Sequence, residues 1–140
     1  MDMEAIKISW LTRYQSMKQK IWYFQKGMRM SALAKNTVVV DYGLGNLHNL
    51  KHTLDYLKIG ATISNRSEEI LNAKRIILPG VGAFAAGMAE LKKKGLVEIL
   101  NDYVETGKPL LGICLGMQLL MTSSNEYGNH KGLGYVKGKV

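Results

Sequence analysis

The sequence predicts an α/β fold, in which a mostly parallel sheet carries helices on both faces. Short apolar runs alternate with segments whose apolar residues recur every three or four positions, as in amphipathic helices. The short runs are continuously apolar, which is typical of strands buried on both faces of a parallel sheet. Three of these runs also end in glycine-containing turns, which suit strand-to-helix corners.

The elements of the first half follow in order. The β-branched run at residues 38–40 predicts a strand, and Asn46 is the expected N-cap of a helix with leucines at 47, 50, 54 and 57 on one face. We expect Gly60 to end that helix. Residues 61–64 and 75–78 predict two further strands, separated by a brief helix at 67–71 that Ser67 opens.

The second half continues the alternation. Apolar residues between 88 and 104 predict a helical region that breaks at Gly95 and stops at Gly107. Residues 110–113 predict the fourth strand, followed by a turn at Cys114 and a helix through Gln118 to Met121. We expect the polar stretch at 123–130 to be a loop.

Composition excludes several classes of protein. A chain of 140 residues that is 46% hydrophobic can fill the core of one domain. Its single cysteine excludes an internal disulfide, which favours a reducing compartment, and we expect a cytoplasmic protein. No apolar run approaches the roughly 18 to 20 residues that a membrane-spanning helix needs.

The positive charge lies mainly at the N-terminus. The net charge is +8, and residues 1–37 contribute seven bases against two acids. We therefore predict a basic N-terminal extension at 1–36, helical or disordered, before a domain at 37–140. The stretch at 10–30 is amphipathic and could attach to an anionic membrane surface, or translation could begin at Met28 or Met30. The charge alone is weak evidence for nucleic-acid binding, and we expect no nucleic-acid or membrane partner.

The first two glycine turns are ambiguous. Residues 41–46 begin like a dinucleotide-binding fingerprint, but His48 stands where the third glycine should be, so the signal is weak. Asn46, His48 and Asn49 could instead present polar groups at the ligand edge of the sheet. The turn at 79–82 could bind an anion or supply an oxyanion donor, and it is equally consistent with a tight corner.

The third turn carries the most specific signal. Gly112, Cys114 and Gly116 follow a buried strand directly and precede a helix, which is the nucleophile-elbow pattern with a thiol in place of a hydroxyl. The glycines permit the cramped turn, the N–H of Leu115 can face a developing oxyanion, and the helix N-terminus favours a thiolate. A buried structural cysteine would not need glycines on both sides, so the pattern favours catalysis.

Four segments together resemble a known family. Residues 41–47, 78–84, 112–120 and 131–134 are similar to class I (triad-type) glutamine amidotransferases, which have a flavodoxin-like three-layer fold. Within that class they most resemble the glutaminase subunit of imidazole glycerol phosphate synthase, of histidine biosynthesis. The resemblance implies hydrolysis of glutamine to glutamate and ammonia, and transfer of the ammonia to a cyclase subunit in a heterodimer.

The resemblance also implies roles for particular residues. Cys114 would be the nucleophile that forms a glutamyl thioester. The resemblance implies no metal and no organic cofactor. The remaining positions fall into three groups: backbone N–H donors of the oxyanion hole at Val81 and Leu115, contacts to glutamine at Gly80, Gly82 and Gln118, and a cyclase interface at Asn46 and Asn49.

One departure from the family pattern limits the expected activity. The family's general base and its orienting acid lie in an H-x-E motif, and none of His48, His52 and His130 stands in one. We therefore expect residues 37–140 to be the N-terminal part of a glutaminase that is weak or inactive by itself. Two alternatives stay open: a paralogous glutaminase that supplies ammonia for sugar modification in surface polysaccharide synthesis, and a non-catalytic module that binds a cyclase.

Overall fold

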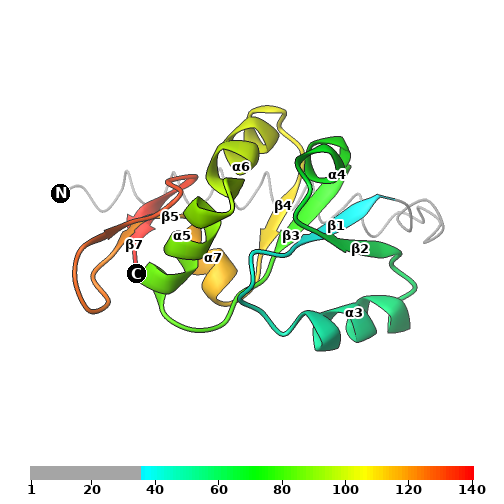
Figure 1. The fold of residues 1–140 in the computed structure, drawn as a ribbon, viewed down its shortest axis with the longest axis horizontal. Helices are drawn as coiled ribbons and strands as arrows, with labels where there is room; N and C mark the ends of the chain where they lie inside the picture. The colour runs from blue at the N-terminus through cyan, green and yellow to red at the C-terminus, as the bar shows by residue number, and fades with distance from the viewer. Residues whose placement is uncertain (1–35) are drawn as a thin grey trace, which may run out of the picture. The chain divides into compact units, whose positions relative to one another are not determined.

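A four-stranded parallel sheet organises the computed structural model, which describes residues 36–140 (Figure 1). The strands lie in the order β2-β1-β3-β4. The register pairs Val39 with Ile77 and Leu78 with Gly112, so β3 and β4 end side by side. The turns that follow these two strands are therefore neighbours at the carboxyl edge of the sheet. The bounds are β1 Thr37–Val40, β2 Ala61–Ser64, β3 Arg75–Leu78 and β4 Leu110–Gly112.

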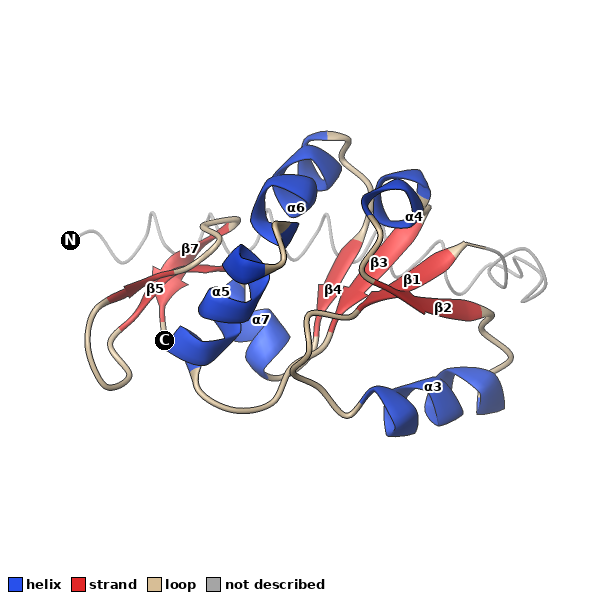
Figure 2. Ribbon diagram, in the orientation of Figure 1, coloured by secondary structure: helices blue, strands red, loops and turns tan. Residues whose placement is uncertain are grey.

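Helices cover the two faces of this sheet unequally. α3 (Leu47–Tyr56) lies on one face of the sheet (Figure 2). On that face Val39, Leu54 and Ile77 form a small buried cluster. The other face carries the larger core, which contains buried residues of α4 (Ser67–Asn72), α5 (Phe84–Lys93), α6 (Leu96–Glu105) and α7 (Leu115–Leu119). The predicted α/β class, with helices on both faces of a parallel sheet, is confirmed.

The helix boundaries have local causes. The Asn46 side chain accepts a hydrogen bond from the N–H of Asn49, at 3.2 Å, and so caps α3 as predicted. Gly95, with φ of +64°, separates α5 from α6, which confirms the predicted break. The predicted stop at Gly60 is wrong, because α3 ends at Tyr56 and the chain turns at Lys58, with φ of +56°.

A second, three-stranded sheet was not predicted. β5 (Met121–Ser124) pairs antiparallel with β6 (His130–Lys131) and parallel with β7 (Val136–Lys139). The predicted helix to Met121 is therefore wrong beyond Leu119, and the predicted loop at 123–130 is a strand at both ends. The helix stops because returning N–H groups bond its last carbonyls: Leu133 donates to Leu119, and Val136 donates to Leu120.

The turn between β5 and β6 is bonded to the start of α5. The Glu126 carboxylate accepts a hydrogen bond from the N–H of Phe84, at 2.9 Å. The N–H groups of a first helical turn lack intrahelical acceptors, and an acidic group there also interacts favourably with the helix dipole. This one contact therefore connects the second sheet to the helix that follows the 79–82 turn.

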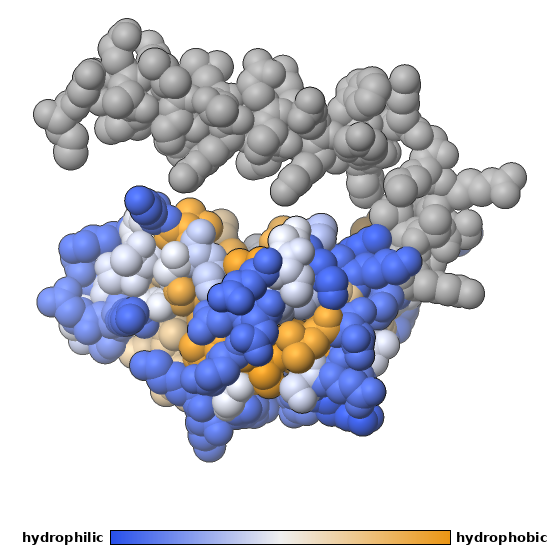
Figure 3. Space-filling view, turned by 90° about the horizontal axis from the view of Figure 1, so that it is seen from above, coloured by the Kyte–Doolittle hydropathy of each residue, from blue (hydrophilic) through white to orange (hydrophobic). Residues whose placement is uncertain are grey.

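On the face seen in Figure 3, hydrophobic patches of the described residues lie among hydrophilic residues. No helix of this part of the chain is long and apolar enough to span a bilayer. The extension predicted at 1–36 lies almost entirely outside the described residues, as do the amphipathic stretch and both candidate start methionines, so the domain division remains a prediction.

Candidate active site at the cysteine elbow

Cys114 occupies a strained bend between β4 and α7. Its backbone angles are φ +53° and ψ −118°, in the left-handed half of φ space that L-residues rarely adopt. The residue is exposed. Such strain persists only where surrounding structure enforces it, and it is concentrated at functional sites. The thiol thus lies at the apex of a turn between a strand and a helix, as the elbow pattern predicts. The expectation that this strand is buried is wrong, because β4 is the edge strand of the described sheet and Leu111 is 56% exposed.

The two glycines of the elbow are required by packing. A Cβ on Gly112 would lie 2.5 Å from the Cα of Met117, and a Cβ on Gly116 would overlap the carbonyl oxygen of Leu78. Neither neighbour can move away readily, because both are backbone atoms. The prediction that these glycines permit a cramped strand-turn-helix is confirmed, because a side chain at either position would collide with backbone atoms.

The 79–82 turn packs directly against the elbow. A Cβ on Gly80 would lie 3.0 Å from the Gly116 nitrogen and 3.0 Å from the Leu115 Cβ. Gly82 has φ of +101° and open space around it, so its backbone conformation favours glycine. Val81, between them, has a half-exposed side chain. The elbow and this turn together form one surface at the carboxyl edge of β3 and β4.

Two backbone donors on this surface are free. Within residues 36–140, the N–H groups of Val81 and Leu115 donate to no protein acceptor. Leu115 is the first residue of α7, where an N–H has no partner inside the helix. Free N–H groups in the elbow and in the turn packed against it are candidate donors to an oxyanion.

Tyr42 lies beneath the 79–82 turn and was not singled out in the sequence. Its side chain is buried, and its hydroxyl donates to the Pro79 carbonyl at 2.7 Å. Burial, with a smaller contribution from the nearby Cys114, raises the pKa of Tyr42 from 10.0 to about 12. The phenol therefore remains protonated, and remains a donor, throughout the neutral range. In the sequence, the only local indication of this buried phenol is a tyrosine that follows Asp41, just after a buried strand.

The remaining residues predicted for the site, Gln118, Asn46 and Asn49, differ in how far they are buried. Gln118 is partly buried on α7, and its N–H donates to the Cys114 carbonyl at 3.1 Å. Asn46 and Asn49 are exposed at the start of α3. The turn before them approaches the 79–82 turn, since a Cβ on Gly45 would lie 3.5 Å from the Cγ of Pro79.

No histidine is bonded to the thiol. His48 and His52 are exposed on α3, with ring centroids 4.6 Å apart, and His130 lies in β6. Within the described residues Cys114 has no side-chain hydrogen bond to any of the three. The described residues also contain no group of three or more His, Cys, Asp or Glu side chains that could hold a metal ion.

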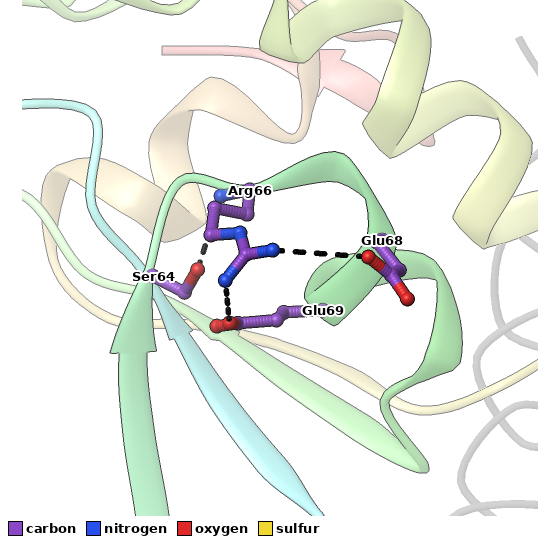
Figure 4. Close-up of polar contacts among 4 residues, drawn as sticks. All are labelled: Ser64, Arg66, Glu68 and Glu69. Atoms are coloured by element: carbon purple, nitrogen blue, oxygen red, sulfur yellow. Dashed lines mark hydrogen bonds and ion pairs between the residues drawn. The ribbon is translucent and has the colours of Figure 1, made fainter.

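A polar cavity of about 410 Å³ lies elsewhere on the sheet and contains none of the elbow residues. Arg66 bonds Glu69 at 3.1 Å and lies 3.8 Å from Glu68, and its backbone N–H donates to Ser64 (Figure 4). These charges are satisfied by one another, so the cysteine elbow remains the candidate site. The cavity is lined by Asn36, Val38, Thr62, Arg66, Glu68, Glu69 and Asn72.

Comparisons with known proteins agree with this geometry. The family model described as glutamine amidotransferase class-I matches residues 38–134. The imidazole glycerol phosphate synthase subunit HisH of Lactiplantibacillus plantarum is 52% identical over 102 residues, and that of Shouchella clausii is 50% identical over 102 residues. Each alignment covers 73% of this chain and 49% of the relative, so the chain spans about half the length of these curated relatives.

A solved structure shows the same similarity in three dimensions. A crystal structure described as a glutamine amidotransferase superposes with a TM-score of 0.62 at 25% sequence identity. The superposition covers 73% of this chain and 54% of that chain.

Proposed function

Given that the chain belongs to the class-I glutamine amidotransferase family, we propose that it is the glutaminase subunit of an imidazole glycerol phosphate synthase. In that role it hydrolyses glutamine through a thioester on Cys114 and supplies ammonia to a cyclase subunit. The observation that carries the proposal is the exposed thiol at a strained bend, with the free N–H of Leu115 next to it and the free N–H of Val81 in the turn packed against the elbow.

The proposed chemistry has two steps. The Cys114 sulfur attacks the side-chain amide carbon of glutamine, the C–N bond breaks, and ammonia leaves with the proton it gains. Water then attacks the thioester, releasing glutamate and restoring the thiol. Each step passes through a tetrahedral oxyanion, and the N–H groups of Val81 and Leu115 are the proposed donors to it. One such donor contributes about 2.7 to 4 kcal/mol in comparable sites.

Substrate contacts are proposed for the residues around the thiol. Gly82 is exposed with open space around it, whereas Gly80 is buried where the turn packs against the elbow. Gln118 lies one helical turn beyond Cys114, on α7. We propose that these three residues bind the glutamine, with its amide carbon held above the cysteine sulfur.

Turnover also needs a general base. Because none of the three histidines is bonded to Cys114, we expect the base to come from outside residues 36–140. A base contributes about 10²- to 10⁴-fold to proton transfer, so without one the elbow supports slow chemistry.

The partner is proposed from the relatives and from one exposed surface. The two relatives are subunits of imidazole glycerol phosphate synthases, which supports histidine biosynthesis over the sugar-modification paralogue. Asn46 and Asn49 are the proposed contacts to the cyclase, since both are exposed at the start of α3, just after the turn whose Gly45 approaches Pro79. A cyclase bound there would be placed to receive ammonia released at the carboxyl edge of the sheet.

The test is glutamate formation by the chain mixed with the cyclase subunit of a histidine pathway. We expect glutamate formation that Cys114→Ala lowers by roughly 10³-fold or more, because the nucleophile is removed. Met117→Ala is the matched control on the same exposed surface, and its rate should stay close to that of the unaltered chain. Binding of the cyclase without any glutamate would contradict the proposal and support a non-catalytic module.

A further inference from the structure

Tyr42 joins the first glycine turn to the second across 37 positions of sequence. Its side chain is 1% exposed, although Gly43 beside it is exposed. The bond from its hydroxyl to the Pro79 carbonyl is short, at 2.7 Å, and lies in the interior. A buried carbonyl that lost this donor would be left unsatisfied, at a cost of about 1 to 3 kcal/mol. The contact is therefore a specific constraint on the 79–82 turn.

The phenol, the turn and the elbow meet around Gly80. A Cβ on Gly80 would overlap the Tyr42 hydroxyl and would also lie within 3.0 Å of the Gly116 nitrogen. A Cβ on Gly116 would in turn lie 3.0 Å from the Pro79 oxygen, which is the acceptor of the Tyr42 bond. The same carbonyl is thus held by the phenol on one side and packed against the elbow on the other.

The direction of that carbonyl affects the turn beyond it. The Pro79 carbonyl belongs to the planar peptide that leads into Gly80, so fixing its oxygen fixes one end of the two-residue path to the Val81 N–H. Gly80 itself has no side chain to restrict its dihedral angles. Without an external constraint, the direction of the Val81 N–H would not be fixed.

We propose that Tyr42 is a positioning residue for the oxyanion site: its hydroxyl holds the Pro79 carbonyl and thereby aims the Val81 N–H at the group attacked by Cys114. This inference rests on the proposed glutaminase function. It assigns to Tyr42 an effect on oxyanion stabilisation, and none on the availability of the thiol.

Tyr103 provides a matched control within the same fold. It is also buried, and its hydroxyl also donates to a proline carbonyl, that of Pro109, at 3.1 Å. Pro109 precedes β4, whereas Cys114 follows that strand, so the control bond lies at the opposite end. Changing either tyrosine to phenylalanine removes one oxygen and one hydrogen bond to a proline carbonyl, buried at Tyr42 and partly buried at Tyr103, but only Tyr42 adjoins the elbow.

The experiment compares two reagents on the same sulfur. Cys114 is the only cysteine of the chain, so thiol modification reports on it alone. Iodoacetamide needs a reactive thiolate, whereas a glutamine-derived chloroketone also develops an oxyanion at its carbonyl. We expect Tyr42→Phe to slow the chloroketone about tenfold, a part of the 10²- to 10³-fold effect of losing a donor. The iodoacetamide rate should stay within about twofold, and Tyr103→Phe should alter neither rate by more.

The outcomes distinguish the proposed glutaminase function from the proposed role of Tyr42. If the chloroketone fails to modify the unaltered chain, the glutaminase function is wrong, and the role of Tyr42 fails with it. If the unaltered chain reacts and Tyr42→Phe reacts equally fast, only the role of Tyr42 is wrong. A parallel fall in both rates would also overturn it, because it would mean that the thiol and not the oxyanion site had changed.

A second variant keeps the test decisive if Tyr42→Phe does not fold. Difluorotyrosine at position 42 preserves the ring and the donor but ionises at a lower pH, and a phenolate cannot donate. Among the described residues, Cys114 is the titratable group that contributes to the pKa of Tyr42. Both reagents react with this same thiol, so the ratio of their rates separates the effect of Tyr42 from that of the thiol. The chloroketone-to-iodoacetamide ratio should fall at a lower pH than in the unaltered chain; an unchanged profile would refute the proposal.

Discussion

Gly116 illustrates how one residue can be fixed by its surroundings. Its φ is not in the left-handed region, so conformational freedom is not the reason for a glycine there. The reason is space, because the Leu78 carbonyl occupies the position of a Cβ. The same carbonyl accepts a hydrogen bond from the Ile113 N–H at 2.9 Å, which holds the strand end in place. The elbow therefore depends on contact between two backbones.

Replacement of Gly116 by a larger residue should therefore destabilise the fold. We expect Gly116→Ala to lower the free energy of unfolding by about 2 to 4 kcal/mol, because the added methyl group must displace the end of β3. Gly45→Ala is the control, since its Cβ would meet side-chain atoms at 3.4 Å and beyond and its φ is ordinary. Urea unfolding of both variants measures the difference. Equal stability of the two would show that the close packing at Gly116 is not rigid.

At the scale of elements, one row of side chains runs across three strands on the face that α3 covers. The register pairs Val39 with Ile77 and Ile77 with Leu111. Val39 and Ile77 are buried beneath α3, whereas Leu111 is 56% exposed at the edge strand β4. Three apolar residues in one row thus contribute differently to stability, because α3 does not reach the last of them.

This row gives a paired prediction. Ile77→Ala should lower the free energy of unfolding by about 2 to 5 kcal/mol, because it leaves a cavity under α3. Leu111→Ala should change it by less than about 1 kcal/mol, since most of that side chain is already in water. Chemical denaturation of the two variants tests the assignment. A loss at Leu111 as large as that at Ile77 would indicate that another surface covers β4.

The parallel sheet could be predicted from sequence because its strands are continuous apolar runs. Residues 76–78 and 110–112 contain no polar side chain, and the helices between them carry clear periodicity. The second sheet could not be predicted in this way. Its strand at 136–139 is exposed throughout and contains Gly138, so its sequence resembles a loop. Tertiary hydrogen bonds from residues 133–136 to the end of α7 define that region.

At the scale of the whole molecule, the candidate site depends both on a local turn and on hydrogen bonds between residues far apart in the sequence. The glycines around Cys114 could be recognised from sequence, because their spacing reports a local turn. The Tyr42–Pro79 and Glu126–Phe84 bonds could not, because they join residues 37 and 42 positions apart. Both contacts end at the segment that begins with Pro79 and enters α5, so the surroundings of the candidate oxyanion donor depend on the assembled fold.

The most direct test of the central claim is the site and stoichiometry of covalent modification by a glutamine-derived chloroketone. Mass spectrometry of the intact and digested chain locates the adduct. The account predicts one adduct, on Cys114, whose formation excess glutamine suppresses, because reagent and substrate occupy the same surface. No adduct on Cys114, or an adduct that forms equally fast with glutamine present, would contradict the claim that this elbow is a glutamine-directed nucleophile.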